Sequence, residues 1–182
     1  MSILCACERT QSLTLALLDV GLDAYSCDLD VCLGSCPSRH IVGDCMQFLD
    51  DFDHVLAFPP CTHLTYANGL HLNQKLLDGR TEQAISFFMA LYHHPKTRMV
   101  ENPLGVVSKF LKYSQIVSPE MFGSDKKKRT CLWLKGLPLL LPTSGRSGNS
   151  FIQSLPGGSF YCSALDPYLA KAMAVQWAKY LV

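Results

Sequence analysis

Short apolar segments that alternate with helical patterns constrain the fold of this chain more than any other feature. Strand-like apolar segments lie at residues 2–7, 24–27, 54–58, 98–100 and 130–134. Helical patterns cover residues 12–20, 79–93 and 167–181, and Gly21 follows the first, where a glycine commonly ends a helix. This alternation predicts an α/β domain with a doubly wound, mostly parallel, Rossmann-like sheet.

Length and composition narrow the class of protein. The 182 residues have the size of one domain, and no repeat or linker divides them, so we expect one domain over residues 1–182. A net charge of +1 excludes a polycation that coats nucleic acid or an anionic membrane. No apolar run reaches the roughly 18–20 residues of a membrane span. The first residues lack signal-peptide features, and nine cysteines, an odd number, disfavour a disulfide scaffold. We therefore expect a cytoplasmic protein, or one of the host cytoplasm if the source is a virus.

Polar side chains that can take part in catalysis or binding follow four of the predicted strands and the short apolar pair at residues 41–42. They are Glu8, Asp28, Asp44, Cys61 and Glu101. Ligands of parallel α/β sheets bind beyond the carboxyl ends of the strands. The sequence therefore predicts one site at this edge of the sheet.

The end of the second strand indicates the type of ligand. Asp28 is well placed to accept hydrogen bonds from ribose hydroxyls, although an aspartate there can also simply cap a loop. The turn that follows the first strand, residues 7–11, contains no glycine and is not a phosphate-binding loop. An adenosine ligand without phosphates, such as S-adenosylmethionine, fits this pattern better than a dinucleotide.

The segment after the 54–58 strand presents a candidate nucleophile. Pro59 and Pro60 fix the backbone and hold Cys61 on a stiff turn. A cysteine thiolate that adds to C6 of cytosine makes C5 electron-rich enough to accept a methyl group. Eight further cysteines make a structural role the ordinary expectation for any one of them, but the double proline distinguishes Cys61.

Two other elements can support that chemistry. Glu101 follows an apolar strand and can give a proton to N3 of the ring, which stabilises the charge that thiolate addition creates. A basic run precedes the strand at 130–134, and its cations can hold phosphates or the base, or form a solvated loop. The run consists of Lys126, Lys127, Lys128 and Arg129.

Taken together, these residues resemble the motifs of DNA (cytosine-5) methyltransferases, and most closely those of short phage-type members. The resemblance extends over nearly the whole chain in order and spacing. The matching segments are Asp28, Gly43-Asp44, Pro59-Pro60-Cys61, Glu101-Asn102-Pro103, Lys128-Arg129-Thr130 and Asp166-Pro167-Tyr168.

The resemblance implies a class I S-adenosylmethionine-dependent methyltransferase fold and C5-methylation of cytosine in DNA. It implies catalytic roles for Cys61, Glu101 and Arg129. It assigns cofactor contacts to Cys7, Glu8, Asp28, Asp44 and Pro60. DNA contacts fall to Lys126, Lys127 and Lys128.

The chain also departs from this family, which keeps alternatives open. The first motif lacks its usual glycines, and the stretch between Arg129 and Pro167 is too short for a target-recognition domain. Because a duplex base must be flipped out before the thiol can reach it, the substrate can be single-stranded or duplex DNA or a cytidine nucleotide, with a specificity partner or homodimer as a possible aid. A degenerate nucleic-acid-binding or nucleotide-binding regulator is a further alternative. So is a structural zinc site at Cys27, Cys32, Cys36 and His40.

Overall fold

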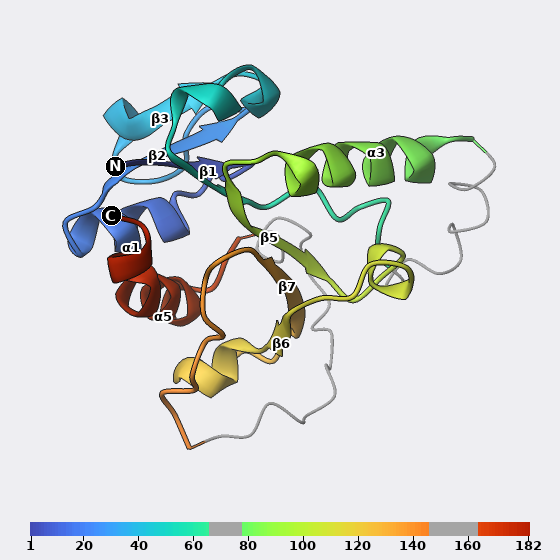
Figure 1. The fold of residues 1–182 in the computed structure, drawn as a ribbon. Helices are drawn as coiled ribbons and strands as arrows, with labels where there is room; N and C mark the ends of the chain where they lie inside the picture. The colour runs from blue at the N-terminus through green and yellow to red at the C-terminus, as the bar shows by residue number, and fades with distance from the viewer. Residues whose placement is uncertain (66–77, 146–163) are drawn as a thin grey trace.

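The computed structural model describes residues 1–65, 78–145 and 164–182, and it contains one seven-stranded sheet (Figure 1). The strands are β1 (Ser2–Ala6), β2 (Asp23–Asp28), β3 (His40–Val42), β4 (His54–Ala57), β5 (Thr97–Pro103), β6 (Gln115–Val117) and β7 (Thr130–Leu134). The α-helices of the described residues are α1 (Ser12–Asp19), α3 (Arg80–His93) and α5 (Pro167–Trp177). Short 3-10 helices are η1 (Pro37–Arg39), η2 (Cys45–Gln47), η3 (Leu49–Asp51), η5 (Val107–Lys109), η6 (Pro119–Phe122) and η7 (Ala178–Tyr180).

The sheet has the strand order β3-β2-β1-β4-β5-β7-β6. Neighbours from β3 to β5 pair in parallel, whereas β7 pairs antiparallel with both β5 and β6. The predicted α/β class with a mostly parallel sheet is confirmed, and the sheet is mixed. The sheet departs from a fully doubly wound arrangement between β2 and β3, because this described crossover contains the 3-10 helix η1 and no α-helix.

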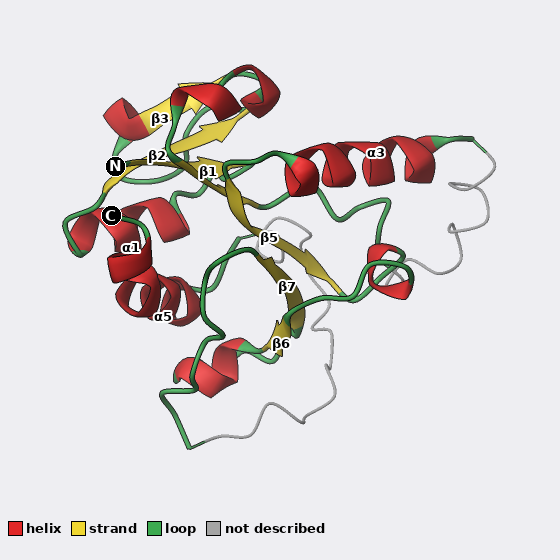
Figure 2. Ribbon diagram, in the orientation of Figure 1, coloured by secondary structure: helices red, strands yellow, loops and turns green. Residues whose placement is uncertain are grey.

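Side chains of the central strands point alternately into two hydrophobic cores. In β1, Ile3 and Cys5 join the core that contains residues of α1 and α5, whereas Leu4 and Ala6 join the core that contains residues of α3. Helices therefore cover both faces of the sheet (Figure 2). None of the helices in the described ranges combines the length and apolar character that crossing a bilayer requires.

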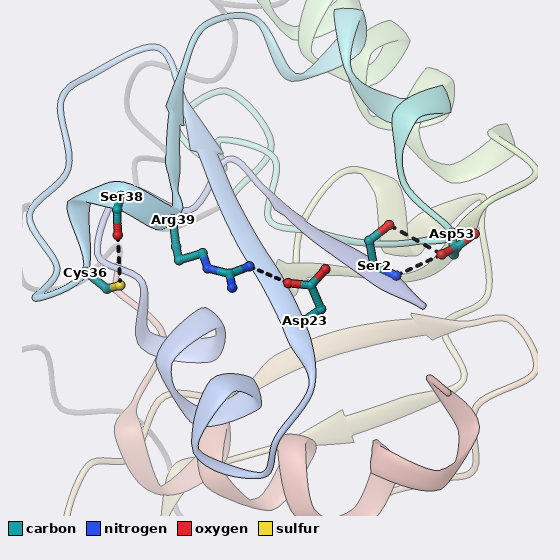
Figure 3. A network of polar contacts seen from close by, with 6 residues as sticks. All are labelled: Ser2, Asp23, Cys36, Ser38, Arg39 and Asp53. Carbon is teal, nitrogen blue, oxygen red and sulfur yellow. Dashed lines mark hydrogen bonds and ion pairs between the residues drawn. The ribbon is translucent and has the colours of Figure 1, made fainter.

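Polar contacts tie together the strand ends at the amino edge of the parallel strands (Figure 3). The backbone N–H of Ser2 donates to Asp53 Oδ2 at 2.8 Å, which joins the start of β1 to the residue before β4. Arg39, just before β3, forms an ion pair with Asp23 at the start of β2. These contacts serve the fold, and the predicted site residues lie at the other edge of the sheet.

Several element bounds differ from those that the sequence predicts. Strand β5 continues through Pro103, so Glu101 lies within the strand instead of following it. Strand β6 and the 3-10 helix η6 were not expected, because β6 has only three residues. The predicted terminal helix ends at Trp177 and continues as η7. The stretch over residues 142–163 is rich in serine and glycine, as loops are, and most of it lies outside the described residues.

Candidate functional site

A cavity of about 350 Å³ opens at the carboxyl edge of the parallel strands, and we call it the large cavity. Four residues predicted to contact a cofactor line it together: Cys7, Asp28, Asp44 and Pro60. They come from the ends of β1, β2, β3 and β4 respectively, as expected for strands that run in parallel. Its volume falls within the range of small-molecule sites.

The two aspartates are held by the local turns in which they lie. Asp28 is the last residue of β2, and its Oδ1 atom accepts a hydrogen bond from the N–H of Asp30 at 3.1 Å. Asp44 caps η2 by accepting from the N–H of Met46 at 3.0 Å. Each side chain is thus fixed through one oxygen, and the other is available to accept a hydrogen bond from a ligand.

Apolar side chains complete the large cavity. Leu29, which is 75% exposed, lies next to Asp28, and Phe87 reaches the cavity from α3. Pro60 adds a third apolar surface. Two carboxylates with apolar walls suit an aromatic base joined to a sugar. No sequence pattern indicated Phe87 as a site residue, because its position depends on how α3 packs on the sheet.

A smaller cavity of about 50 Å³ lies beside the same strand end. Phe58 lines this small cavity and Pro60 lines the large one, so both cavities border residues 58–60. The small cavity brings together charged residues from β5, the basic run and the start of α5. They are Glu101, Lys126, Lys128 and Asp166.

Glu101 has an environment that favours its protonated form. Burial raises the pKa of this carboxyl group, although a hydrogen bond from Thr130 and the charge of Lys128 act in the opposite direction. The Thr130 hydroxyl donates to Glu101 Oε1 from the neighbouring strand β7. Glu101 can therefore hold a proton at a higher pH than an exposed glutamate.

Asp166 lies in the segment that resembles the family's C-terminal motif, although the sequence-based assignment gave this residue no role of its own. It caps α5 by accepting from the N–H of Tyr168 at 3.0 Å, accepts from the Ser124 hydroxyl at 2.9 Å, and lies 3.8 Å from Lys126 Nζ. An aspartate just before a proline is a common helix start, so the sequence did contain a signal for the cap. The ion pair with Lys126 depends on tertiary structure.

Cys61 lies in a turn over residues 59–65, which we call the Cys61 turn, and hydrogen bonds join this turn to the segment that follows Glu101. The buried Asn102 side chain donates to the Pro59 carbonyl at 2.8 Å. The N–H of Val106 donates to the Leu64 carbonyl at 2.7 Å. The turn is therefore fastened before and after the half-buried Cys61, next to the strand that carries Glu101.

Other predicted site residues lie elsewhere. In the described residues, neither cavity lining includes Cys61, Glu8, Lys127 or Arg129. Lys127 is exposed, and Arg129 lies close enough to Cys131 for its charge to lower the pKa of that thiol, which burial raises overall to about 12.

Glu8 faces the first helix. Its carboxylate accepts hydrogen bonds from the N–H of Thr14 at 3.1 Å and from the Thr14 hydroxyl at 2.6 Å, and it also accepts from the N–H of Leu13. Burial raises the pKa of Glu8 to about 7, although these hydrogen bonds lower it. The carboxylate is thus used to cap α1.

The zinc alternative finds no support in the described part of the chain, where no group of three or more His, Cys, Asp or Glu residues could hold a metal ion. The four candidate side chains each bond to a local partner instead, and one of these contacts is drawn in Figure 3. The contacts join Cys27 to the Gly43 carbonyl at 3.4 Å, Cys32 to the Gly34 carbonyl at 3.6 Å, Cys36 to the Ser38 hydroxyl at 3.6 Å and His40 Nδ1 to the Ser26 hydroxyl at 2.8 Å.

Comparisons with known proteins assign no family. No protein-family model matches the chain, and no curated protein is significantly similar to it in sequence.

Proposed function

We propose that this protein is an S-adenosylmethionine-dependent methyltransferase that modifies C5 of cytosine through a covalent adduct on Cys61. One observation carries the proposal. The large cavity is lined by Asp28 and Asp44, the candidate ligands of an adenosyl group, and also by Pro60, the residue that directly precedes Cys61. A cofactor in this cavity would therefore lie next to the turn that holds the nucleophile.

The strand order supports a doubly wound fold of the class I methyltransferase type. An antiparallel β7 inserted between β5 and β6 suits that type, as do helices on both faces of the sheet. The crossover from β2 to β3 departs from it, because it lacks an α-helix. We keep the class I assignment as part of the proposal.

The residues of the large cavity fit an adenosyl group by their chemistry. Asp28 can accept hydrogen bonds from ribose hydroxyls, and Asp44 can accept one from the amino group of adenine. Leu29, Pro60 and Phe87 offer apolar contact to the ring. When bound, S-adenosylmethionine supplies the methyl group.

The chain's own residues would carry the remaining chemistry. The Cys61 thiolate forms a bond to C6 of cytosine, and the protonated Glu101 gives its proton to N3, so the ring gains no net charge. C5 then has the electron density to accept a methyl group. After methylation, a base removes the C5 proton and Cys61 leaves C6 as a thiolate. The N3 proton returns to Glu101, which restores the aromatic ring. Arg129 directly precedes Thr130, whose hydroxyl bonds to Glu101, and it would hold the base or its phosphate.

The substrate class remains cytosine in DNA or a cytidine nucleotide. Lys126 and Lys128 line the small cavity beside Glu101, where cations can attract a phosphate. A specificity partner or a homodimer would supply duplex recognition. A cytoplasmic location, in the host cell if the source is a virus, is part of the same proposal.

A binding protein without transferase activity is the second candidate, and Glu8 favours it. The backbone N–H groups of Leu13 and Thr14, at the start of α1, could hold an anionic group of a ligand. They already donate hydrogen bonds to the Glu8 carboxylate. A protein that binds an adenosyl or nucleotide ligand in the large cavity without transferring a methyl group is compatible with that arrangement.

Methyl transfer from labelled S-adenosylmethionine tests the proposal. Single-stranded DNA, duplex DNA and dCMP should be assayed side by side. Cys61→Ala should abolish transfer, because the proposed bond to C6 forms on the Cys61 sulfur. The matched control is Cys36→Ala, which removes another half-buried thiol and should leave transfer unchanged.

A 5-fluorocytosine substrate provides the covalent readout. Fluorine cannot leave C5 as a proton does, so the adduct should persist and map to Cys61. Transfer that survives in Cys61→Ala, or an adduct on another cysteine, would remove Cys61 from this role. Cofactor binding with no transfer to any of the three substrates would favour the binding protein.

A further inference from the structure

Three cysteine thiols line the wall of the large cavity, and two of them are in contact. The lining includes Cys7, Cys27 and Cys45, and the Sγ atoms of Cys7 and Cys45 lie 3.7 Å apart. Cys7 directly follows β1, whereas Cys45 begins η2 after β3. The fold thus brings together two thiols from distant parts of the chain at the carboxyl edge of the sheet.

The backbone at Cys7 adds a second observation. Cys7 has a φ of 60°, in the left-handed region that non-glycine residues rarely adopt. Strained backbone of this kind is concentrated at functional sites. Bond formation would require the sulfur atoms to approach by about 1.7 Å, because a disulfide bond is about 2.05 Å long. Such a movement is small for a residue at a turn and a residue in a single 3-10 turn.

The contact also makes the two thiols chemically different. A hydrogen bond from the Cys7 thiol lowers the pKa of Cys45, and the same contact raises the pKa of Cys7. Cys45 is therefore the group that ionises more readily, and the thiolate is the form that reacts with oxidants. Cys7 is placed to react second.

We propose that Cys7 and Cys45 form a reversible dithiol–disulfide pair that responds to hydrogen peroxide. The Cys45 thiolate attacks one peroxide oxygen, the O–O bond breaks, and the released hydroxide takes up a proton to leave as water. The Cys7 thiol then attacks the Cys45 sulfur, and the sulfenic oxygen leaves with the Cys7 proton as a second water. Two thiols and one peroxide thus give one disulfide and two waters.

The disulfide would change the large cavity, because both cysteines lie in its wall with Asp28 and Asp44. Drawing η2 toward the end of β1 moves Asp44, the residue next to Cys45. Oxidation therefore lowers affinity for a molecule in the cavity, and a bound molecule slows oxidation. This effect on a cofactor rests on the proposed function, whereas formation of the disulfide does not.

Peptide mapping of the full-length protein tests the pair. The reduced protein is treated with hydrogen peroxide, the remaining thiols are alkylated, and the digest is analysed by mass spectrometry. The expected product links the Cys7 and Cys45 peptides, has lost two hydrogen atoms, and returns to the dithiol with dithiothreitol. Cys7→Ser and Cys45→Ser should each abolish it, and the control Cys27→Ser, which removes the third cavity thiol, should retain it.

Other linkages would overturn the proposal. Oxidation of the wild-type protein that leaves Cys7 and Cys45 unlinked, or links either of them mainly to Cys27, contradicts it even if a variant fails to fold. S-adenosylhomocysteine at ten times its dissociation constant should slow the linkage by about tenfold. A linkage that forms at an unchanged rate supports the dithiol pair and counts against an adenosyl group in the cavity.

Discussion

At the scale of single residues, the buried Glu8 carboxyl group caps the start of α1. Glu8 is 4% exposed and lies against the start of α1. Its predicted cofactor contact depended on its position after β1. The sequence could not reveal its direction, because the left-handed backbone at Cys7 and the contact with Thr14 arise only in the folded chain.

Glu8 should make stability fall as pH rises. Burial raises its pKa from an ordinary value of 4.5 to about 7, so the folded state holds this proton more tightly than the unfolded state. Its contribution to the free energy of unfolding is therefore greatest below pH 4.5, decreases between pH 4.5 and about 7, and then levels off. The decrease is about 3 kcal/mol.

Urea unfolding at several pH values measures this slope. Glu8→Gln should remove most of it, because the amide cannot ionise. Glu82→Gln, at an exposed glutamate of α3, is the control and should keep it. An unchanged slope in Glu8→Gln would show that another group is responsible.

At the scale of elements, the site depends on how the Cys61 turn is fastened to the segment after β5. The longer strands could be predicted from their apolar residues, unlike the three-residue β6, and so could the position of Asp28, Asp44 and Pro60 at one edge of the sheet. The contacts that attach the Cys61 turn could not be predicted, because Asn102 and Gly105 meet residues 59–65 only in the tertiary structure. The antiparallel direction of β7 was also hidden, since a fully buried strand has the same pattern in either direction.

Gly105→Ala should disturb the Cys61 turn. A Cβ atom at Gly105 would lie 2.0 Å from the Leu64 carbonyl oxygen, so the backbone of the turn must move. We expect methyl transfer to fall by about 100-fold, the order of loss from misplacing a reacting group by about 1 Å. A Cβ atom at Gly145 meets no atom of the described residues within 4 Å, so Gly145→Ala should leave the rate unchanged. Equal rates in the two variants would show that the turn does not position the nucleophile.

At the scale of the whole molecule, one sheet supplies residues to two cores, so both should unfold together. Each core contains one of the two tryptophans. Trp177, the last residue of α5, lies in the core that contains residues of α1, and Trp133 packs against Phe88 of α3 with ring centres 5.0 Å apart. Loss of either core exposes the faces of the same strands.

Proteins with a single tryptophan can test this coupling. Trp133→Phe leaves Trp177 as the fluorescent probe of the core that contains α1 residues. Trp177→Phe leaves Trp133 as the probe of the core that contains α3 residues. Within each variant, the urea midpoint from tryptophan fluorescence should equal the midpoint from far-ultraviolet circular dichroism. Fluorescence that changes before the secondary structure is lost, in either variant, would mean that the two cores are independent.

The central claim is that the large cavity holds an adenosyl group beside the Cys61 turn, and calorimetry of S-adenosylmethionine binding to the reduced protein tests it most directly. We predict saturable binding that Asp28→Ala and Asp44→Ala each weaken by about tenfold or more, as expected for loss of a hydrogen bond to a charged group. Asp51→Ala, at an exposed aspartate of η3, should bind like the wild type. No binding by the wild-type protein, or binding that neither cavity variant weakens, would contradict the account.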